Sequence, residues 1–118
     1  METTHDIKEL EEIARQLRVQ TLKVIHHAGS GHPGGSLSAT DMITALYFSR
    51  LNHKPDEPTW KSRDRFVLSK GHCCPILYCT LARQGYFADD ELWKLRQFSA
   101  LLQGHPNPKI PGIETAAG

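Results

Sequence analysis

The chain contains one stretch with the character of a central β-strand, Arg65-Phe66-Val67-Leu68-Ser69. It is short, mostly apolar and flanked by charged residues, which is typical of a strand in the middle of a parallel sheet. A helix is expected shortly after it, from about Cys74 to Gln84, with Pro75 in its first turn and Gly85 at its end. The stretch therefore indicates one strand–turn–helix unit of an α/β fold.

The turn of this unit, Lys70-Gly71-His72, is a candidate ligand site. Ligands of open parallel sheets bind beyond the carboxyl ends of the strands, and the free N–H groups of the next helix suit a phosphate. Gly71 lets the backbone come close to a ligand, and His72 can donate a hydrogen bond to an anion. The pattern is also compatible with a turn glycine and a histidine that only fills a corner.

Two further loops carry a histidine directly after a glycine. One is Gly31-His32-Pro33-Gly34-Gly35, where small neighbours let a bulky ligand approach an imidazole that titrates near neutral pH. The other is Gly104-His105-Pro106, within a loop expected from Gln103 to Gly118. Each loop alone could simply join two elements. Three such loops, each beside the end of an element, favour a functional role for these histidines over a purely structural one.

Helices are expected on either side of the strand. Apolar residues spaced by three and four predict a long helix over residues 7–28, which Asp6 caps and Gly29 ends. The glycines and proline of Gly29–Ser36 predict a loop. Two more helices are expected over 38–51, capped by Ser38, and over 89–98, where the inward-facing residues are Leu92, Leu95 and Phe98.

Composition excludes several classes of protein. The 118 residues carry 14 basic and 13 acidic side chains, so the net charge of +1 gives no footprint for nucleic acid or an anionic membrane. No apolar run reaches the roughly 20 residues that span a bilayer, and the polar N-terminus is unlike a secretory signal. The odd number of cysteines, namely Cys73, Cys74 and Cys79, argues against a disulfide framework and for the cytoplasm.

The expected elements do not complete a domain. Four helices and one strand leave that strand without a partner on either edge. We therefore expect the opening segment of a larger doubly wound parallel-sheet α/β domain, mostly helical over this range with one clear strand. Seven histidines and three cysteines also suggest a structural zinc site as an alternative. The spacing argues against it, because Cys73-Cys74 is not a C-x₂-C pair and no H-x₃₋₅-H pair accompanies it.

Three collinear segments resemble the transketolase family. Gly29–Ser36 resembles the S-G-H-P-G segment near the start of transketolases, and Arg63–His72 resembles their R-D-R-F-V-L-S-x-G-H segment. Gly104-His105-Pro106 with Ile110–Gly118 resembles their G-H-P…P-G-[IV]-E-x-x-x-G segment. The resemblance runs from about Leu10 to Gly118. It implies that residues 1–118 are the N-terminal, incomplete part of a thiamine-diphosphate-binding domain.

The resemblance also implies roles for individual residues. His32 matches a histidine that faces the substrate and assists proton transfers, and His105 matches one that contacts the hydroxyl groups of the bound ketose. His72 matches a histidine on the cofactor diphosphate. Gly118 matches the first glycine of a loop against the cofactor, and Gly35 matches a small residue near the thiazolium ring.

The family resemblance implies a cytoplasmic enzyme of carbohydrate metabolism, as in the pentose phosphate pathway. Such enzymes move a two-carbon ketol unit between sugar phosphates, with thiamine diphosphate and Mg²⁺ as cofactors. The family's metal motif and its activating glutamate do not occur in this sequence, so we expect no activity and feeble cofactor binding from the chain alone. The expected partners are a C-terminal transketolase subunit or domain, in a homodimer or heterotetramer.

Two alternatives stay open at this point. A sister enzyme such as deoxyxylulose-phosphate synthase shares the S-G-H-x-G and S-K-G-H segments, although the segment around His105 favours transketolase. A chain of this length could also be a non-catalytic remnant or interaction module that keeps the same opening of the fold.

Overall fold

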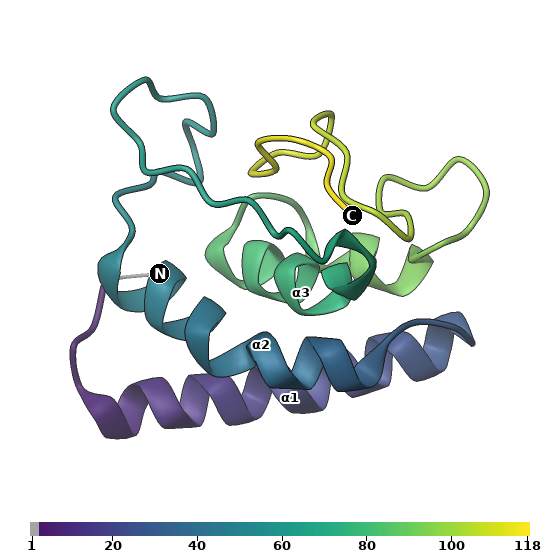
Figure 1. The fold of residues 1–118 in the computed structure, drawn as a ribbon, viewed down its shortest axis with the longest axis horizontal. Coiled ribbons are helices and arrows are strands. Elements are labelled where there is room, and N and C mark those ends of the chain that lie inside the picture. The colour runs from purple at the N-terminus through teal and green to yellow at the C-terminus, as the bar shows by residue number, and fades with distance from the viewer. Residues whose placement is uncertain (1–2) are drawn as a thin grey trace.

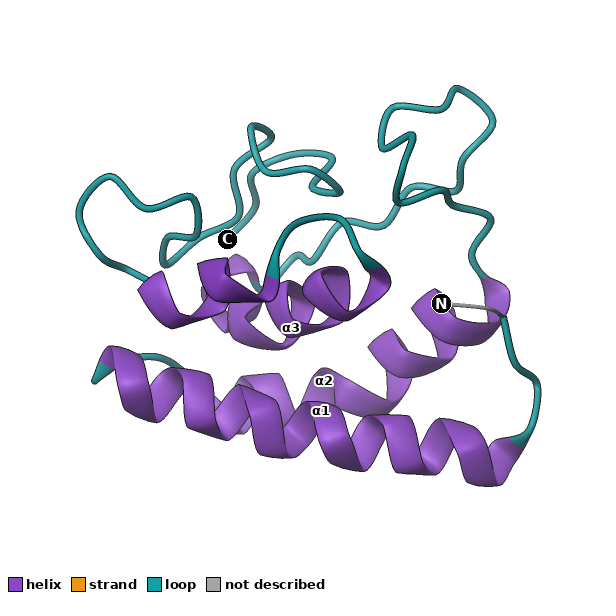
Figure 2. Ribbon diagram, turned by 180° about the vertical axis from the view of Figure 1, so that it is seen from behind, coloured by secondary structure: helices purple, strands orange, loops and turns teal. Residues whose placement is uncertain are grey.

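The computed structural model describes residues 3–118, and its helices lie in layers beneath the long loops (Figures 1 and 2). Helices α1 (Ile7–Ala28) and α2 (Pro33–Ala45) pack against each other and run in opposite directions. Helix α3 (Cys74–Gln84) packs on both of them. The loops lie on the side of α3 that faces away from α1, so one face of the molecule gathers segments that are distant in sequence.

Helix α1 has the predicted bounds and caps. The side chain of Asp6 accepts a hydrogen bond from the backbone N–H of Lys8, and Gly29 ends the helix with a left-handed φ of 76°. Its buried stripe includes Leu17 and Val24. Ile7 is expected in that stripe from its spacing, but it is the first residue of the helix and is 65% exposed.

Helix α2 begins earlier than the sequence predicts. The expected loop Gly29–Ser36 ends at His32, and Pro33, Gly34 and Gly35 form the first turn of the helix. Proline suits this position because its missing N–H has no helical partner there in any case. Ser38 is therefore an interior residue rather than the predicted cap. The helix continues into one π-helical turn, η1 (Leu46–Arg50), so its predicted end near Leu51 is nearly correct.

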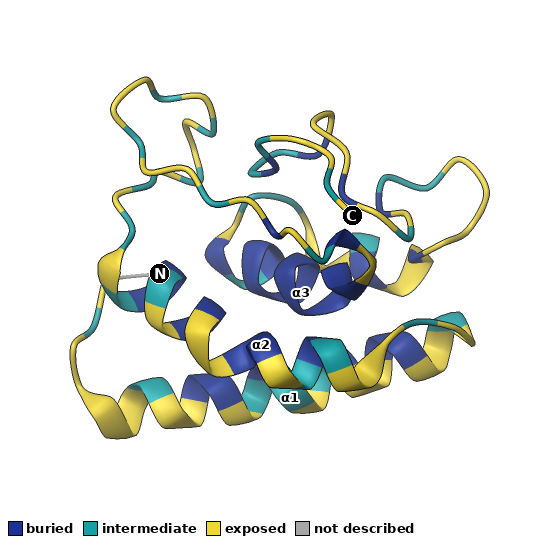
Figure 3. Ribbon diagram, in the orientation of Figure 1, coloured by how far each residue is buried: buried dark blue, intermediate teal, exposed yellow. Residues whose placement is uncertain are grey.

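Helix α3 is the centre of the hydrophobic core and matches the prediction. Every residue of α3 except Arg83 is buried, as the dark blue ribbon in Figure 3 shows. A short 3₁₀ turn, η2 (Gly71–Cys73), leads into it, and Gly85 ends it with a φ of 94°. The largest buried side chain, Tyr78, projects from this helix. Helix α3 thus holds η2, and with it His72, in a fixed place over α1 and α2.

The predicted strand Arg65–Ser69 is wrong for the described chain, because residues 3–118 contain no strand (Figure 2). The stretch is irregular, and no backbone hydrogen bond between described residues involves residues 65–69. Leu68 is buried, whereas Val67 is 47% exposed. The cause is the absence of any second extended segment beside it, since a strand exists only when its N–H and C=O groups are paired.

The predicted helix over 89–98 is also wrong in type and length. A 3₁₀ helix, η3 (Asp89–Lys94), takes its place, and Leu92 and Leu95 are buried as expected. Arg96 adopts a positive φ of 67°, which ends any helix at that point. Phe98 is 99% exposed rather than inward-facing.

The last segment, residues 103–118, is a loop as predicted. It lies over α3 and brings the end of the chain close to η2 (Figure 1). Among residues 3–118, no helix has the length and apolar character that a membrane crossing requires.

Candidate active site

Two of the Gly-His loops meet through their imidazole rings. The ring centroids of His32 and His72 lie 4.9 Å apart, and the rings meet edge to face at 81°. His32 is the residue before the first turn of α2, and His72 lies in η2, so two different elements position the pair. Both side chains are exposed. Their ring nitrogens are therefore open to a ligand that carries hydrogen-bond acceptors or donors.

The third loop reaches the same place through close backbone contacts. A Cβ atom on Gly118 would lie 3.0 Å from the Cα atom of Gly71 and 3.4 Å from the Cδ2 atom of His105. A Cβ on Gly71 would overlap the carbonyl group of Ala117. Gly118 also has a φ of 90°, which only glycine adopts readily. The structure therefore brings His105 and Gly118 beside the turn that carries His72.

Gly35 allows α2 to approach η2. A Cβ on Gly35 would collide with the Sγ atom of Cys73, so no larger residue fits without movement. The hydroxyl of the next residue, Ser36, donates a hydrogen bond of 3.3 Å to the carbonyl of Cys73. Gly35 thus faces the backbone that holds His72. All five residues that the sequence singles out, including His32 and His105, belong to this one cluster of loops.

Lys70 is not among the predicted site residues, yet it joins two of the loops. Its Nζ atom donates to the carbonyl of Gly35 at 2.8 Å and contacts the hydroxyl of Ser38 at 3.0 Å. Lys70 immediately precedes η2, so these bonds tie the start of η2 to the first turns of α2. The only sequence signal is its position next to Gly71-His72, because the reach of a lysine is not visible in a local pattern.

Cys74 and Tyr78 anchor the loop of His105. The thiol of Cys74 donates to the carbonyl of Gly104 at 3.3 Å, and the hydroxyl of Tyr78 donates to that of Gln103 at 2.8 Å. Burial raises the pKa of the Cys74 thiol to about 11, so it keeps its proton, and its role as donor, at neutral pH. Both donors project from α3, so the position of the His105 loop is fixed relative to this helix.

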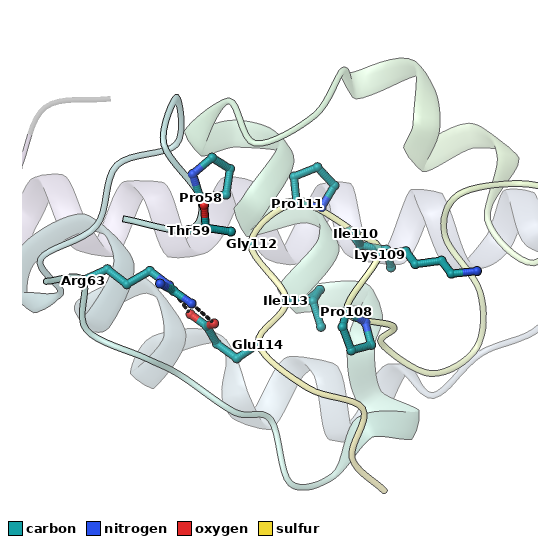
Figure 4. A pocket seen from close by; sticks show the side chains of 10 residues that line it. All are labelled: Pro58, Thr59, Arg63, Pro108, Lys109, Ile110, Pro111, Gly112, Ile113 and Glu114. Carbon is teal, nitrogen blue, oxygen red and sulfur yellow. Dashed lines mark hydrogen bonds and ion pairs between the residues drawn. The ribbon is translucent and has the colours of Figure 1, made fainter. Parts of the chain in front are cut away.

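A half-buried ion pair holds the outer loops together beside the site. The guanidinium of Arg63 binds the carboxylate of Glu114 through two bonds of 2.8 and 2.6 Å, and the side chains are 15% and 18% exposed. Figure 4 shows the two side chains pointing toward each other from separate loops, at the edge of a pocket of about 390 Å³. None of the five expected site residues lines this pocket.

The histidines of the cluster are not accompanied by the further side chains that a metal site would need. Within the described range 3–118, no set of three or more His, Cys, Asp or Glu side chains lies close enough to hold a metal ion. Cys73, Cys74 and Cys79 are buried free thiols. Chemically, the site offers three imidazoles that can hold or move protons, and glycine-lined backbone that a ligand can approach.

Solved transketolases share this arrangement of elements. The transketolase from Campylobacter jejuni superposes with a TM-score of 0.90 at 38% identity, over 96% of this chain and 18% of that chain. The enzyme from Leishmania mexicana gives a TM-score of 0.88 at 32% identity, over 92% of this chain and 17% of that chain. The fold is therefore that of part of a transketolase, and its α/β class follows from these neighbours although no strand forms within residues 3–118.

Curated relatives agree with the structural neighbours. Human transketolase is 40% identical over 112 residues, which are 95% of this chain and 18% of the relative. A relative from Phocaeicola vulgatus, which is one subunit of an apulose-4-phosphate transketolase, is 39% identical over 112 residues. These are 95% of this chain and 40% of that relative. The chain thus spans less than half the length of either relative.

The family follows from the match over nearly the whole chain. The family model described as "Transketolase, thiamine diphosphate binding domain" matches residues 9–118. The chain belongs to this family, as the three sequence segments indicated.

Proposed function

We propose that residues 1–118 are the N-terminal, incomplete part of a thiamine-diphosphate-binding domain in a ketol transferase. The complete enzyme would transfer a two-carbon ketol unit from a ketose phosphate to an aldose phosphate. The observation that carries the proposal is the convergence of three Gly-His loops, seen in the contact of His32 with His72 and of His105 with Gly118. The family match over residues 9–118 supports it independently.

The residues present fit the cofactor. A Cβ atom on Gly35 would collide with Cys73, and one on Gly118 would crowd the backbone of Gly71, so glycine at both positions lets the loops that would hold the cofactor approach one another. His72 is exposed in the turn before α3, where its imidazole can donate to a diphosphate oxygen. Bound thiamine diphosphate supplies the chemistry that breaks and forms the carbon–carbon bond. The contribution of this chain is to hold His72 and the glycine backbone in position.

His32 and His105 are the proposed catalytic residues. Both imidazoles are exposed on the loop side of the molecule, and each follows a glycine that keeps its surroundings open. His32 would accept and return protons of the sugar hydroxyl groups, and His105 would hold the hydroxyl groups of the ketose by hydrogen bonds. Lys70 keeps the His32 loop against the His72 loop through its bond to Gly35.

The complete site needs parts from outside residues 1–118. Because residues 3–118 hold no cluster of metal-binding side chains, the ligands of Mg²⁺ would come from other segments. We propose a C-terminal subunit or domain as partner, in a homodimer or heterotetramer, and a cytoplasmic location. The Phocaeicola relative is named as one subunit of an apulose-4-phosphate transketolase, which fits both sugar phosphates as the substrate class and an enzyme built from separate chains.

A chimera tests the proposal. The matching 112 residues of human transketolase are replaced by the corresponding residues of this chain, and ketol transfer is measured with thiamine diphosphate and Mg²⁺. We expect an active enzyme in which His32→Ala lowers kcat about 10²-fold or more, because a positioned proton carrier is lost. His26→Ala is the matched control, since the exposed side chain of His26, in the last turn of α1, makes no hydrogen bond or ring contact with His32, His72 or His105 within residues 3–118.

Measuring whether the chimera binds thiamine diphosphate distinguishes a loss of catalysis from a loss of folding. A chimera that folds and binds thiamine diphosphate, yet transfers no ketol unit, would contradict the catalytic proposal and favour a non-catalytic remnant. Unchanged kcat in both His32→Ala and His105→Ala would contradict the assigned roles. Ketol transfer by the 118-residue chain alone would show that no further segment is needed.

A further inference from the structure

A second pocket lies on the helical side of the molecule. It has a volume of about 370 Å³ and lies between α1, α3 and η3. The residues that line it are Arg15, Gln16, Val19, Gln20, Lys23, Arg83 and Trp93. Small-molecule sites in proteins span about 300–1,000 Å³, so the pocket is large enough for a small ligand. It shares no residue with the Gly-His loops, and it is therefore independent of the proposed ketol transfer.

The pocket concentrates positive charge in a chain of nearly zero net charge. Three basic side chains line it and no acidic one does. Arg15 is engaged by Glu12 at 2.7 Å, but no side-chain hydrogen bond or ion pair within residues 3–118 uses Lys23 or Arg83. The Nε atom of Arg83 is moreover buried without a hydrogen-bond partner. A buried donor in that state is costly, and a turn of the guanidinium toward an anion in the pocket would remove that cost.

Part of the pocket lining is apolar and aromatic. Trp93 is 37% exposed and Val19 is 41% exposed, so both present carbon surface to the pocket. The ring of His27 meets the indole of Trp93 edge to face at 5.6 Å and supports it from the side. A flat or apolar group next to the anion would cover this wall and remove it from water.

We propose that this pocket binds a small organic phosphate, with the phosphate on Lys23 and Arg83 and a flat organic body against Trp93. Lys23 and Arg83 form no ion pair within residues 3–118. The carboxylate of Glu12, whose pKa is lowered mainly by Arg15, nevertheless lies near enough to Arg83 for that guanidinium to lower its pKa as well. The two cations suit the double charge of a phosphate monoester, and the guanidinium offers two parallel donors to its oxygens. Inorganic phosphate would use only the cationic half of the pocket. A nucleoside monophosphate such as AMP would use both halves and would bind more tightly.

Fluorescence of Trp93 provides the test. Trp60→Phe leaves Trp93 as the single tryptophan, and AMP or inorganic phosphate is then titrated into the 118-residue chain. We expect a saturable change with AMP, at least fivefold weaker binding of inorganic phosphate, and weaker binding of both at high salt. Lys23→Gln and Arg83→Gln should each weaken AMP binding about tenfold, which corresponds to the loss of one charged hydrogen bond.

Controls make each outcome decisive. Lys8→Gln removes a lysine of the same helix that does not line the pocket, and it should leave AMP binding unchanged. Circular dichroism of every variant shows whether the helices are retained. The absence of a saturable response to AMP in the folded chain would overturn the proposal, as would equal loss of binding in Lys8→Gln and Lys23→Gln. Equal affinity for AMP and inorganic phosphate would refute the contact with Trp93.

Discussion

At the scale of single residues, the site depends on glycines, because the space that a Cβ atom would need is already occupied. Gly34 and Gly35 are neighbours in the first turn of α2, but their surroundings differ completely. A Cβ on Gly34 would meet nothing within 4 Å, whereas a Cβ on Gly35 would strike the Sγ atom of Cys73. The two positions therefore form a matched pair in which only tertiary packing differs.

We predict opposite effects for alanine at these two positions. Gly35→Ala should lower the free energy of unfolding by about 1–3 kcal/mol, because the added methyl group forces α2 away from η2. Gly34→Ala should raise it by up to about 1 kcal/mol, because alanine favours a helix more than glycine does. Urea denaturation followed by circular dichroism measures both. Equal destabilisation by the two variants would contradict the tight contact with Cys73.

The ion pair of Arg63 and Glu114 gives a second prediction at this scale. Glu114→Gln should lower the midpoint of urea denaturation more than Glu12→Gln. The side chains of Arg63 and Glu114 are only 15% and 18% exposed, whereas those of Arg15 and Glu12 are 64% and 51% exposed and screened by water. A larger effect of Glu12→Gln would show that the loop contact contributes little to stability.

Single residues also show how far sequence reasoning reaches into the site. His32, His72 and His105 could be selected because each stands in a Gly-His loop beside the end of an element. Their convergence could not be derived from spacing, because it depends on the close backbone contact of Gly71 with Gly118. The role of Lys70 could not be predicted for a related reason, since its acceptor on Gly35 is 35 residues away along the chain.

At the scale of elements, local propensity predicted the helices whose ends are marked by caps. Helix α1 has Asp6 and Gly29 at its ends, and both residues act as predicted. Helix α2 contradicts the rule that glycines mark a loop, because its packing against η2 requires a glycine at position 35 within a helical turn. The expected strand Arg65–Ser69 does not form, because within residues 3–118 no second extended segment lies beside it to pair with its backbone.

Hydrogen exchange tests this explanation of the missing strand. In the 118-residue chain, the backbone amide protons of residues 66–68 should exchange almost as fast as those of an unfolded peptide, since no hydrogen bond holds them. The amide protons of Leu77 and Leu81 within α3 should exchange far more slowly, and they serve as the internal control. Strong protection of Val67 in the isolated chain would mean that the segment has a partner there.

At the scale of the whole molecule, the buried core makes the fold sensitive to alkali. Burial raises the pKa of the Cys79 thiol from its ordinary value of 9.0 to about 12, and that of Cys74 from 9.0 to about 11. Burial likewise raises the pKa of the Tyr86 hydroxyl to about 12. The two thiols must remain neutral for the helices to pack, because their ionisation would place a charge in an apolar interior.

We predict that stability is lost above pH 9. Below that pH the thiols are protonated in both the folded and the unfolded chain, so they add no pH dependence. Above it the unfolded chain releases their protons first, and the free energy of unfolding should fall steadily as the pH rises toward 12. Urea denaturation at pH 7, 9 and 11 measures the change, and Cys79→Ala should show a shallower fall. A constant free energy from pH 8 to 11 would contradict the prediction.

The contacts that close the site have a consequence for how the chain folds. Ser36 bonds to Cys73 across 37 positions, Arg63 to Glu114 across 51, and Gly71 lies against Ala117 near the end of the chain. Contacts between distant positions form slowly, whereas neighbouring helices such as α1 and α2 pair quickly. On the ribosome the helical base can therefore assemble early, but the imidazoles of His72 and His105 come together only after residue 117 has emerged. Within residues 3–118, the face that carries the Gly-His loops is thus the last part to assemble.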